Sequence, residues 1–283
     1  MFSNIYIYGL GMMGGSLAKS IKQKNLAKKI YGFDINHDNL IFAKKKKIID
    51  DYDNNFKYLK NADLIIICAP VSKYKSIFKN ISKNKKEGAI ITDIGSTKVD
   101  IIKEYKKAFN KNIACFIGSH PLTGKESSSV QNSDPNLFNK AVILVTPEDE
   151  NDKVLVKTIL SFWKKLGCNT FVISPIQHDL VLSETSHLPH LVSFALVNII
   201  QNTTSIENIE DYTGGGFRDF ARLAHSDSSM WKDICFSNKK NIINSINLLK
   251  KELDHIKLLI NKKDHRLGRY LKNIKMKLEK HDK

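Results

Sequence analysis

The sequence predicts an α/β domain followed by an all-α domain, and three observations lead to that prediction. Over residues 1–174, short apolar runs alternate with amphipathic stretches, which is typical of a parallel sheet covered by helices on both faces. From Pro175 onward no strand pattern appears. A chain of 283 residues is long for one core and short for three. We therefore predict two domains, over residues 1–174 and 175–283.

The first domain is expected to contain a series of buried strands with helices between them. Helical periodicity is expected over residues 97–109 and 155–167. Residues 35–62 are less clearly patterned, and a further, poorly marked strand is expected among them. The clear strand candidates are residues 4–9, 29–34, 63–70, 89–95, 112–118, 141–147 and 169–174.

The second domain is expected to be helical throughout. Residues 180–201 are apolar nearly all round, which predicts a helix buried within the domain or between subunits, with a kink at Pro189. The strongly basic segment after Asn261 is expected to fray. Toward the C-terminus, apolar residues recur at alternating steps of four and three residues. This spacing predicts a narrow apolar seam that packs against a partner helix, within the domain or across a dimer. The seam residues are Ile242, Ile246, Leu249, Leu253, Ile256, Ile260, Leu267, Leu271, Ile274 and Leu278.

The net charge of +16 first suggests a nucleic-acid partner, but the type of basic residue argues against one. Arginine occurs only at positions 218, 222, 266 and 269, whereas proteins that read DNA grooves rely on bidentate arginine. The remaining basic residues are lysines spread along the chain. We expect no nucleic acid partner, and a basic surface also suits an anionic small substrate.

Other sequence features predict a cytoplasmic protein. No run approaches the roughly 18 uncharged apolar residues that a membrane span needs, so no membrane partner is expected. The chain enters its first strand without a charged leader. The four cysteines form no CxxC pair, which predicts neither a zinc site nor a disulfide framework.

The segment GLGMMG, residues 9–14, predicts a Rossmann-type dinucleotide site because it follows a strand and opens a helix. Gly9 permits a tight turn, Gly11 lets the backbone approach a pyrophosphate, and Gly14 allows close packing of helix on strand. Asp34 closes the second strand 20 residues past Gly14, where a carboxylate would bind both ribose hydroxyls and repel a 2′-phosphate. This pattern favours NAD over NADP. The expected cofactor contacts are Gly9, Gly11, Met13, Gly14, Asp34, Ala69, Pro70 and Ser96.

Polar groups follow three other strands, at the edge of a parallel sheet where ligands bind. They are Cys68-Ala69-Pro70, Asp93-Ile94-Gly95-Ser96 and Ser119-His120-Pro121. His120 is thus expected beside the cofactor, where an imidazole can accept a proton near neutral pH. An isolated histidine more often satisfies a local carbonyl, but Ser96 at the adjacent strand end favours a functional role.

The helical half carries two further groups of polar residues. GGGFRDFARLA, residues 214–224, places Arg218 and Arg222 one turn apart, which suggests a clamp for carboxylates, although Asp219 could simply pair with Arg218. SHLPH places His187 and His190 around Pro189. We expect no metal site there, because the spacing is not HExxH and no third ligand is evident.

Within residues 5–235, seven motifs taken in order resemble the prephenate/arogenate dehydrogenases of tyrosine biosynthesis. The motifs are GLGMMGGSLA, YGFD, DIGSTK, GSHPLTGKESS, SHLPH, GGGFRDFARLA and MWKDI. The chain departs from the family pattern at Ser129, where the family has glycine, and this puts the conformation of that loop in doubt.

The resemblance implies an NAD-dependent oxidative decarboxylation of prephenate to 4-hydroxyphenylpyruvate, or of arogenate to tyrosine. It implies that His120 is the catalytic base and that Ser96 orients the reacting alcohol. It assigns substrate binding to Arg222, His190, Gly215 and Trp231, although Trp231 could be a packing residue, and it implies a homodimer formed through the helical domain. The alternatives are a β-hydroxyacid dehydrogenase, which shares only the N-terminal motif, and a non-catalytic Rossmann protein that binds NAD or nucleic acid.

Overall fold

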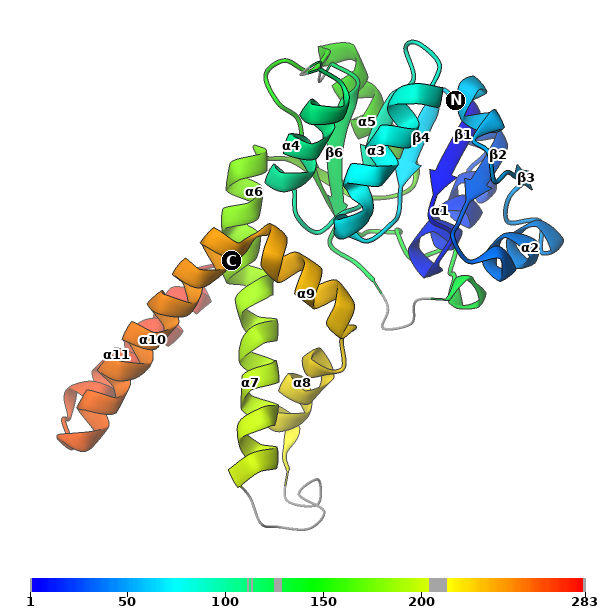
Figure 1. The fold of residues 1–283 in the computed structure, drawn as a ribbon. Coiled ribbons are helices and arrows are strands. Elements are labelled where there is room, and N and C mark those ends of the chain that lie inside the picture. The colour runs from blue at the N-terminus through cyan, green and yellow to red at the C-terminus, as the bar shows by residue number, and fades with distance from the viewer. Residues whose placement is uncertain (1, 111, 113, 125–128, 204–212, 282–283) are drawn as a thin grey trace. The chain divides into compact units, whose positions relative to one another are not determined.

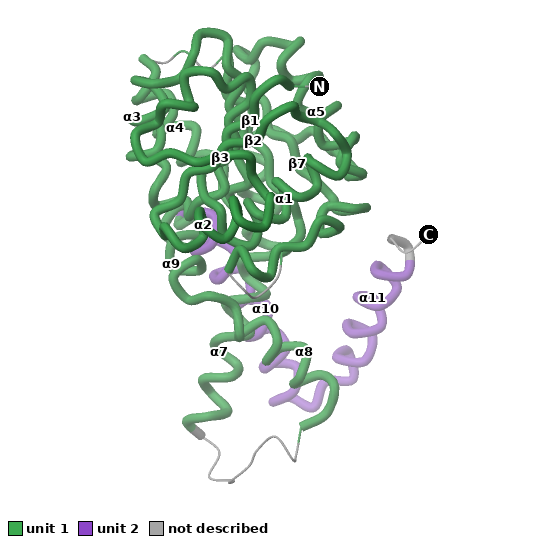
Figure 2. Tube along the Cα trace, turned by 90° about the vertical axis from the view of Figure 1, so that its right-hand side faces the viewer, with its two compact units in different colours: residues 1–239 green, residues 240–283 purple. Residues whose placement is uncertain are grey.

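A computed structural model gives the fold (Figure 1), and it describes residues 2–110, 112, 114–124, 129–203 and 213–281. The chain forms two compact units, residues 1–239 and residues 240–283, which are coloured separately in Figure 2. The first unit therefore contains the whole sheet and also the first part of the helical half. A domain boundary after residue 174 remains a prediction.

The described residues form an eight-stranded sheet with the order β3-β2-β1-β4-β5-β6-β7-β8. Among β1 to β6, every pair of neighbouring strands is parallel, as expected. The expected strand among residues 35–62 is present as the short β3. The strands are β1 (Phe2–Tyr8), β2 (Ala27–Phe33), β3 (Asp51–Tyr52), β4 (Leu64–Ile67), β5 (Ile90–Asp93), β6 (Phe116–Pro121), β7 (Val142–Thr146) and β8 (Asn169–Val172).

The far edge of the sheet differs from the prediction of a wholly parallel sheet. Strand β7 is antiparallel to β6, and β8 is parallel to β7. A parallel return needs a crossover connection, usually an α-helix. The described residues between β6 and β7 contain only the short 3-10 turn η3 (Val130–Asn132), so the chain returns in the opposite direction. Strand β6 also begins later than predicted, and His120 lies inside it rather than after it.

Helices cover both faces of the sheet, which confirms the α/β prediction. Alternate residues of β1 point to opposite faces: Ile5 and Ile7 join one buried cluster, and Tyr6 and Tyr8 join the other. The first cluster packs under α1 (Met12–Gln23), α2 (His37–Lys45) and α5 (Lys153–Lys165). The second packs under α3 (Tyr74–Asn84) and α4 (Val99–Ala108), on the opposite face in Figure 1.

The expected apolar helix extends from Pro175 to Thr203 and changes type in the middle. Helix α6 (Pro175–Leu182) passes through a π-helical turn, η4 (Ser183–His187), into α7 (Leu188–Thr203). Pro189 lies just after this wider turn, which accommodates a residue that cannot donate a backbone hydrogen bond. Residues Pro175–Asn202 are long and apolar enough to cross a membrane by length and composition, so the expectation that no run approaches this limit was wrong. Only 22% of the apolar window is buried.

The remaining helices complete the helical half. In the second unit the rings of His255 and Tyr270 are in edge contact, with centroids 5.2 Å apart, and join α10 to α11. The expectation that the basic segment after Asn261 frays was wrong, because Leu267, Leu271, Ile274 and Leu278 give α11 a regular apolar stripe. The helices are α8 (Gly215–Ala224), α9 (Ser228–Ser237), α10 (Lys239–Asn261) and α11 (Arg266–His281).

Candidate active site

The turn after β1 has the tight geometry that the glycine motif predicts. Gly9 has a φ of +100°, a conformation that side chains other than glycine rarely adopt. A Cβ atom on Gly9 would lie 2.5 Å from the Cys68 carbonyl oxygen, and one on Gly14 would lie 1.9 Å from the Gly9 carbonyl oxygen. The first turn of α1 therefore packs directly on the ends of β1 and β4.

The N-terminus of α1 has the features of a phosphate site. Gly11 is its N-cap, with no side-chain cap and no acidic residue in the first turn, so Met13 and its neighbours present backbone N–H groups. Asp34 follows β2 and stays half-exposed. Its carboxylate accepts hydrogen bonds from the backbone N–H of Leu10 at 2.6 Å and of Asn36 at 2.7 Å. These residues fit a dinucleotide, and Ala69 and Pro70 follow β4 at the same edge of the sheet.

His120 is held in β6 at this same edge and is only 8% exposed. The preceding residue, Ser119, is fixed from both sides: its Oγ accepts a hydrogen bond from Trp163 Nε1 at 3.0 Å and lies 3.0 Å from Thr92 Oγ1. The Ser119 backbone N–H donates to Asp93 Oδ1 at 3.0 Å, across from β5. The backbone that carries His120 is therefore rigidly placed.

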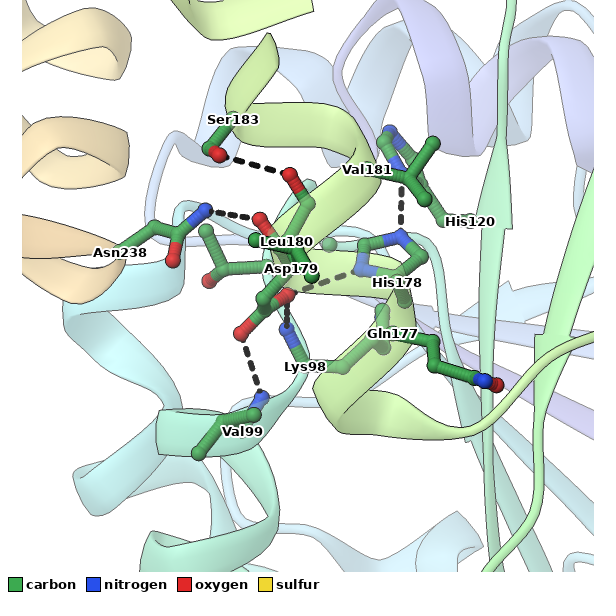
Figure 3. A network of polar contacts seen from close by, with 12 residues as sticks. Lys98, Val99, His120, Gln177, His178, Asp179, Leu180, Val181, Ser183 and Asn238 are labelled. Atoms are coloured by element: carbon green, nitrogen blue, oxygen red, sulfur yellow. Dashed lines mark hydrogen bonds and ion pairs between the residues drawn. The ribbon is translucent and has the colours of Figure 1, made fainter. Parts of the chain in front are cut away.

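The imidazole of His120 begins a chain of polar contacts that reaches into the helical half (Figure 3). Its Nδ1 lies 2.9 Å from Nε2 of His178, at the start of α6. Nδ1 of His178 lies 2.8 Å from Asp179 Oδ1. The backbone N–H groups of Lys98 and Val99, at the start of α4, donate to the two Asp179 carboxylate oxygens at 2.8 and 2.9 Å.

The side chain of Lys98 joins this chain to the loop after β5. Both Lys98 and Asp93 are fully buried, and they form an ion pair. Lys98 Nζ also donates to the Ser119 carbonyl oxygen at 2.7 Å, and Asp93 Oδ2 accepts from the Gly95 N–H at 2.9 Å. The loop that carries Ser96 is thus anchored by the groups that hold β6. Ser96 itself is half-buried.

The surroundings of His120 keep its imidazole neutral. Burial lowers the pKa of His120 well below its ordinary value, and the charges of His178, Lys98 and His187 lower it further. Burial also lowers the pKa of His178, although the hydrogen bond to Asp179 opposes this effect. A neutral histidine has one lone-pair nitrogen, so the site contains a base at neutral pH.

A second cluster, formed by α7, α9 and the π-turn, lies next to this chain of contacts. Asn238 Nδ2 donates to the Asp179 carbonyl oxygen at 2.6 Å and lies 3.2 Å from His187 Nδ1. The ring of Trp231 makes an edge contact with His187 and stacks on His190 at a centroid distance of 4.1 Å. The contacts therefore run from His120 through His178 and Asp179 to this cluster, which contains His190 and Trp231, two of the predicted substrate-binding residues.

The predicted residues of α8 are not part of that chain of contacts. Arg218 and Arg222 are exposed, and neither guanidinium makes a hydrogen bond or an ion pair with another described residue. Gly215 opens α8, and a Cβ built on it would meet open space. Residues 125–128 of the motif GSHPLTGKESS lie outside the described residues. Ser129 has an extended backbone, with a φ of −80° and a ψ of 144°, so this position does not require glycine.

Sequence reasoning missed three residues of the site: His178, Asp179 and Lys98. A signal existed for each of them. Lys98 lies in DIGSTK, directly after a buried strand, and the adjacent His178 and Asp179 are polar residues in an apolar helix. Nothing in the spacing of 58 residues between His120 and His178 indicated that their rings meet. No group of three or more candidate metal ligands occurs in the portion of the chain that the structure covers.

Comparisons with known proteins match both halves of the chain. The nucleotide-binding domain of prephenate dehydrogenases matches residues 17–172, and the dimerization domain of the same family matches residues 174–273. The prephenate dehydrogenase of Bacillus subtilis (strain 168) is 32% identical over 279 residues, which cover 97% of this chain and 75% of that protein. The prephenate dehydrogenase of Lactococcus lactis (strain MG1363) is 34% identical, with coverage of 92% and 72%.

Among solved structures, the chain is similar to the crystal structure of prephenate dehydrogenase from Aquifex aeolicus in complex with hydroxyphenyl propionate and NAD+. The TM-score is 0.91, the sequence identity is 36%, and the match covers 99% of this chain and 98% of that one. The resemblance inferred from the sequence motifs is thereby confirmed. Both domains of the family are present in their family order, and this chain belongs to the prephenate dehydrogenases.

Proposed function

We propose that this enzyme converts prephenate to 4-hydroxyphenylpyruvate with His120 as the catalytic base. The observation that carries the proposal is a buried, neutral histidine at the edge of the sheet that also carries the dinucleotide motif. The family and the oxidoreductase activity with NAD follow from the comparisons. The roles of individual residues are our proposal.

The reaction balances without a further oxidant. The glycine turn and the N-terminus of α1, with Gly11 and Met13, would hold NAD, which would supply the acceptor for the hydride of the ring carbon that bears the hydroxyl group. His120 accepts the hydroxyl proton as the hydride leaves. The bond between the ring and its carboxylate breaks, carbon dioxide departs, and the electron pair completes the aromatic ring, whose oxygen recovers a proton. Aromatisation supplies the driving force, so the protein mainly positions its two ligands.

Ser96 is placed to orient the reacting alcohol and the nicotinamide. It follows β5, beside the strand that carries His120, and its loop is anchored by Asp93 and Lys98. A hydroxyl at this position donates to or accepts from the substrate oxygen without adding charge.

The carboxylates of the substrate need donors, and the cluster around α9 offers one. Trp231 is buried, and its Nε1–H has no hydrogen-bond partner among the described residues. A buried donor without a partner is costly, and a substrate carboxylate would satisfy it. His190, which stacks on Trp231, contributes a second polar group. Arg222 and Gly215 of α8 complete the proposed substrate site, with Arg222 as the cation.

The same proposal includes the assembly and location of the enzyme. The two family segments meet between residues 172 and 174, which supports a domain boundary after residue 174. Two copies pair through the helical domain, in which only 22% of the apolar window of the long helix is buried within one chain. The four free cysteines support a cytoplasmic location, because thiols stay reduced there.

The substrate can be settled by measuring NADH production with prephenate and with arogenate side by side. We expect turnover with prephenate, and a ratio of kcat/KM values that shows which side chain, keto or amino, is preferred. A 3-hydroxyacid serves as the control for the β-hydroxyacid dehydrogenase alternative. NADH formation from the 3-hydroxyacid alone would contradict the proposal.

A further inference from the structure

The contacts around His178 fix which nitrogen atoms carry hydrogen. Asp179 accepts backbone N–H hydrogen bonds on both carboxylate oxygens, at 2.8 and 2.9 Å, so it acts as an acceptor. Nδ1 of His178, which lies 2.8 Å from Asp179 Oδ1, must therefore donate. In a neutral imidazole the other nitrogen is then an acceptor.

The direction of the next hydrogen bond follows from this assignment. Nε2 of His178 is the acceptor, so Nδ1 of His120, 2.9 Å away, is the donor. The hydrogen of His120 is thus on Nδ1, and its lone pair is on Nε2. The opposite direction would place the lone pair of His178 Nδ1 against the Asp179 carboxylate, which is electrostatically unfavourable.

We infer that His178 and Asp179 are positioning residues that hold His120 as the Nδ1–H tautomer, with Nε2 free to accept the substrate proton. This inference deepens the proposed function and rests on His120 being the base. A neutral histidine with its hydrogen on Nε2 would present a donor to the substrate hydroxyl, and the proton transfer would have no acceptor. In hydrolases a carboxylate orients a catalytic histidine by the same principle.

The charged and titratable groups around His120 and His178 are consistent with two neutral rings in one fixed arrangement. Lys98 and Asp93 face it from α4 and β5 as a buried ion pair, and His187 faces it from the π-turn. Burial lowers the pKa of both His120 and His178, so neither ring takes up a second proton at neutral pH. Because the Lys98 and Val99 amides begin α4, Asp179 also fixes the start of that helix.

The inference is tested with the full-length protein labelled with 15N at histidine. The tautomer of His120 is read from long-range 1H–15N spectra, assigned with the His120→Asn variant, and kcat, KM and NAD affinity are measured in parallel. His178→Leu removes the acceptor for His120 and is the main variant. His178→Gln offers an amide oxygen to His120 and an amide N–H to Asp179. His265→Leu, in an exposed position outside the site, is the matched control.

The wild-type protein should show His120 with hydrogen on Nδ1. His178→Leu should shift His120 toward the Nε2–H tautomer and lower kcat by about two to three orders of magnitude, while NAD affinity stays unchanged. His178→Gln should keep the tautomer and stay within about tenfold of wild-type kcat, and His265→Leu should match wild type. If His178→Leu does not fold, Asp179→Asn decides, because an amide donor facing His178 should also shift the tautomer and reduce kcat.

Three results would overturn the inference. One is a wild-type His120 with hydrogen on Nε2. Another is a folded His178→Leu protein with wild-type tautomer and kcat. The third is a folded His178→Gln protein as inactive as His178→Leu. A wild-type enzyme that makes no NADH from prephenate would instead contradict the proposed function, and the ring spectra would still decide the tautomer claim.

Discussion

At the scale of single residues, the site depends on polar groups that are buried and mutually satisfied. Lys98 and Asp93 have no exposed side-chain surface, and each also bonds to backbone groups of neighbouring segments. Removing one member of such a pair leaves a charge uncompensated, which costs several kcal/mol. The pair therefore fixes the loop of Ser96 and the strand of His120 in one arrangement.

The buried histidines predict how stability depends on pH. Burial lowers the pKa of His187 to about 4, whereas in an unfolded chain it titrates near 6.5. As the pH falls below 6.5 the unfolded state binds this proton first, so the free energy of unfolding should fall, by up to about 3 kcal/mol by pH 4 for this residue. His120 and His178 shift in the same direction.

Thermal unfolding measured from pH 7 to pH 4.5 checks this prediction. The midpoint temperature should decrease over that interval, and His187→Gln should weaken the dependence. Asp51 and Asp264, whose pKa values are lowered to about 2, stay ionised in this range and should not contribute. A midpoint that is constant or rises on acidification would contradict the assignment of neutral buried histidines.

At the scale of elements, the carboxyl ends of β1, β2, β4, β5 and β6 bring the site together. The parallel direction of these strands follows from the apolar runs and the helices between them, and so does the shared edge at which Gly9, Asp34, Ser96 and His120 lie. These features could be predicted because each depends on a local pattern and a general rule of topology.

The features that could not be predicted depend on contacts remote in sequence. The direction of β7 depends on how the chain returns from β6. An apolar run of five residues does not indicate whether the strand is parallel or antiparallel to its neighbour. The π-turn at Ser183–His187, in which Ser183 and His187 are buried, precedes Pro189, and the apolar pattern alone does not distinguish it from an α-helical turn. The meeting of His120 with His178 requires the helical half to reach the sheet edge, which no spacing in the sequence indicates.

The glycine turn predicts a clear outcome for Gly14→Ala. The added Cβ would lie 1.9 Å from the Gly9 carbonyl oxygen, so α1 must move away from β1. We expect a lower melting temperature and NAD affinity weakened by about tenfold or more, since the helix N-terminus would no longer approach the pyrophosphate. Isothermal titration with NAD measures this effect.

Gly268→Ala is the matched control, because a Cβ at that position of α11 meets no atom within 4 Å. It should leave NAD affinity unchanged and alter stability by about 1 kcal/mol at most. Equal loss of NAD binding in both variants would contradict the role of the turn.

At the scale of the whole molecule, several large apolar side chains of the helical half are exposed. In α10 and α11, Leu253, Ile260, Leu271 and Leu278 are each more than half exposed. These residues belong to the predicted seam, and all but Leu278 fall within the segment that matches the dimerization domain of the family. A second copy that covers them would bury this surface.

The dimer is tested by analytical ultracentrifugation of the full-length protein. A mass of about twice 32.2 kDa is expected for wild type. Leu253→Glu should shift the population toward monomer, because it would place a charge in the interface. Val154→Glu replaces a residue that is 69% exposed in α5 and should remain dimeric. A wild-type monomer at micromolar concentration would contradict the proposal.

The central claim is that the imidazole of His120 accepts the proton of the substrate hydroxyl, and the turnover of His120→Asn tests it most directly. Asparagine keeps a polar side chain of similar size but cannot act as a base at neutral pH. We predict that kcat for NADH production from prephenate falls by about two to four orders of magnitude, with NAD affinity nearly unchanged. A His120→Asn protein that turns over prephenate at the wild-type rate would contradict the account.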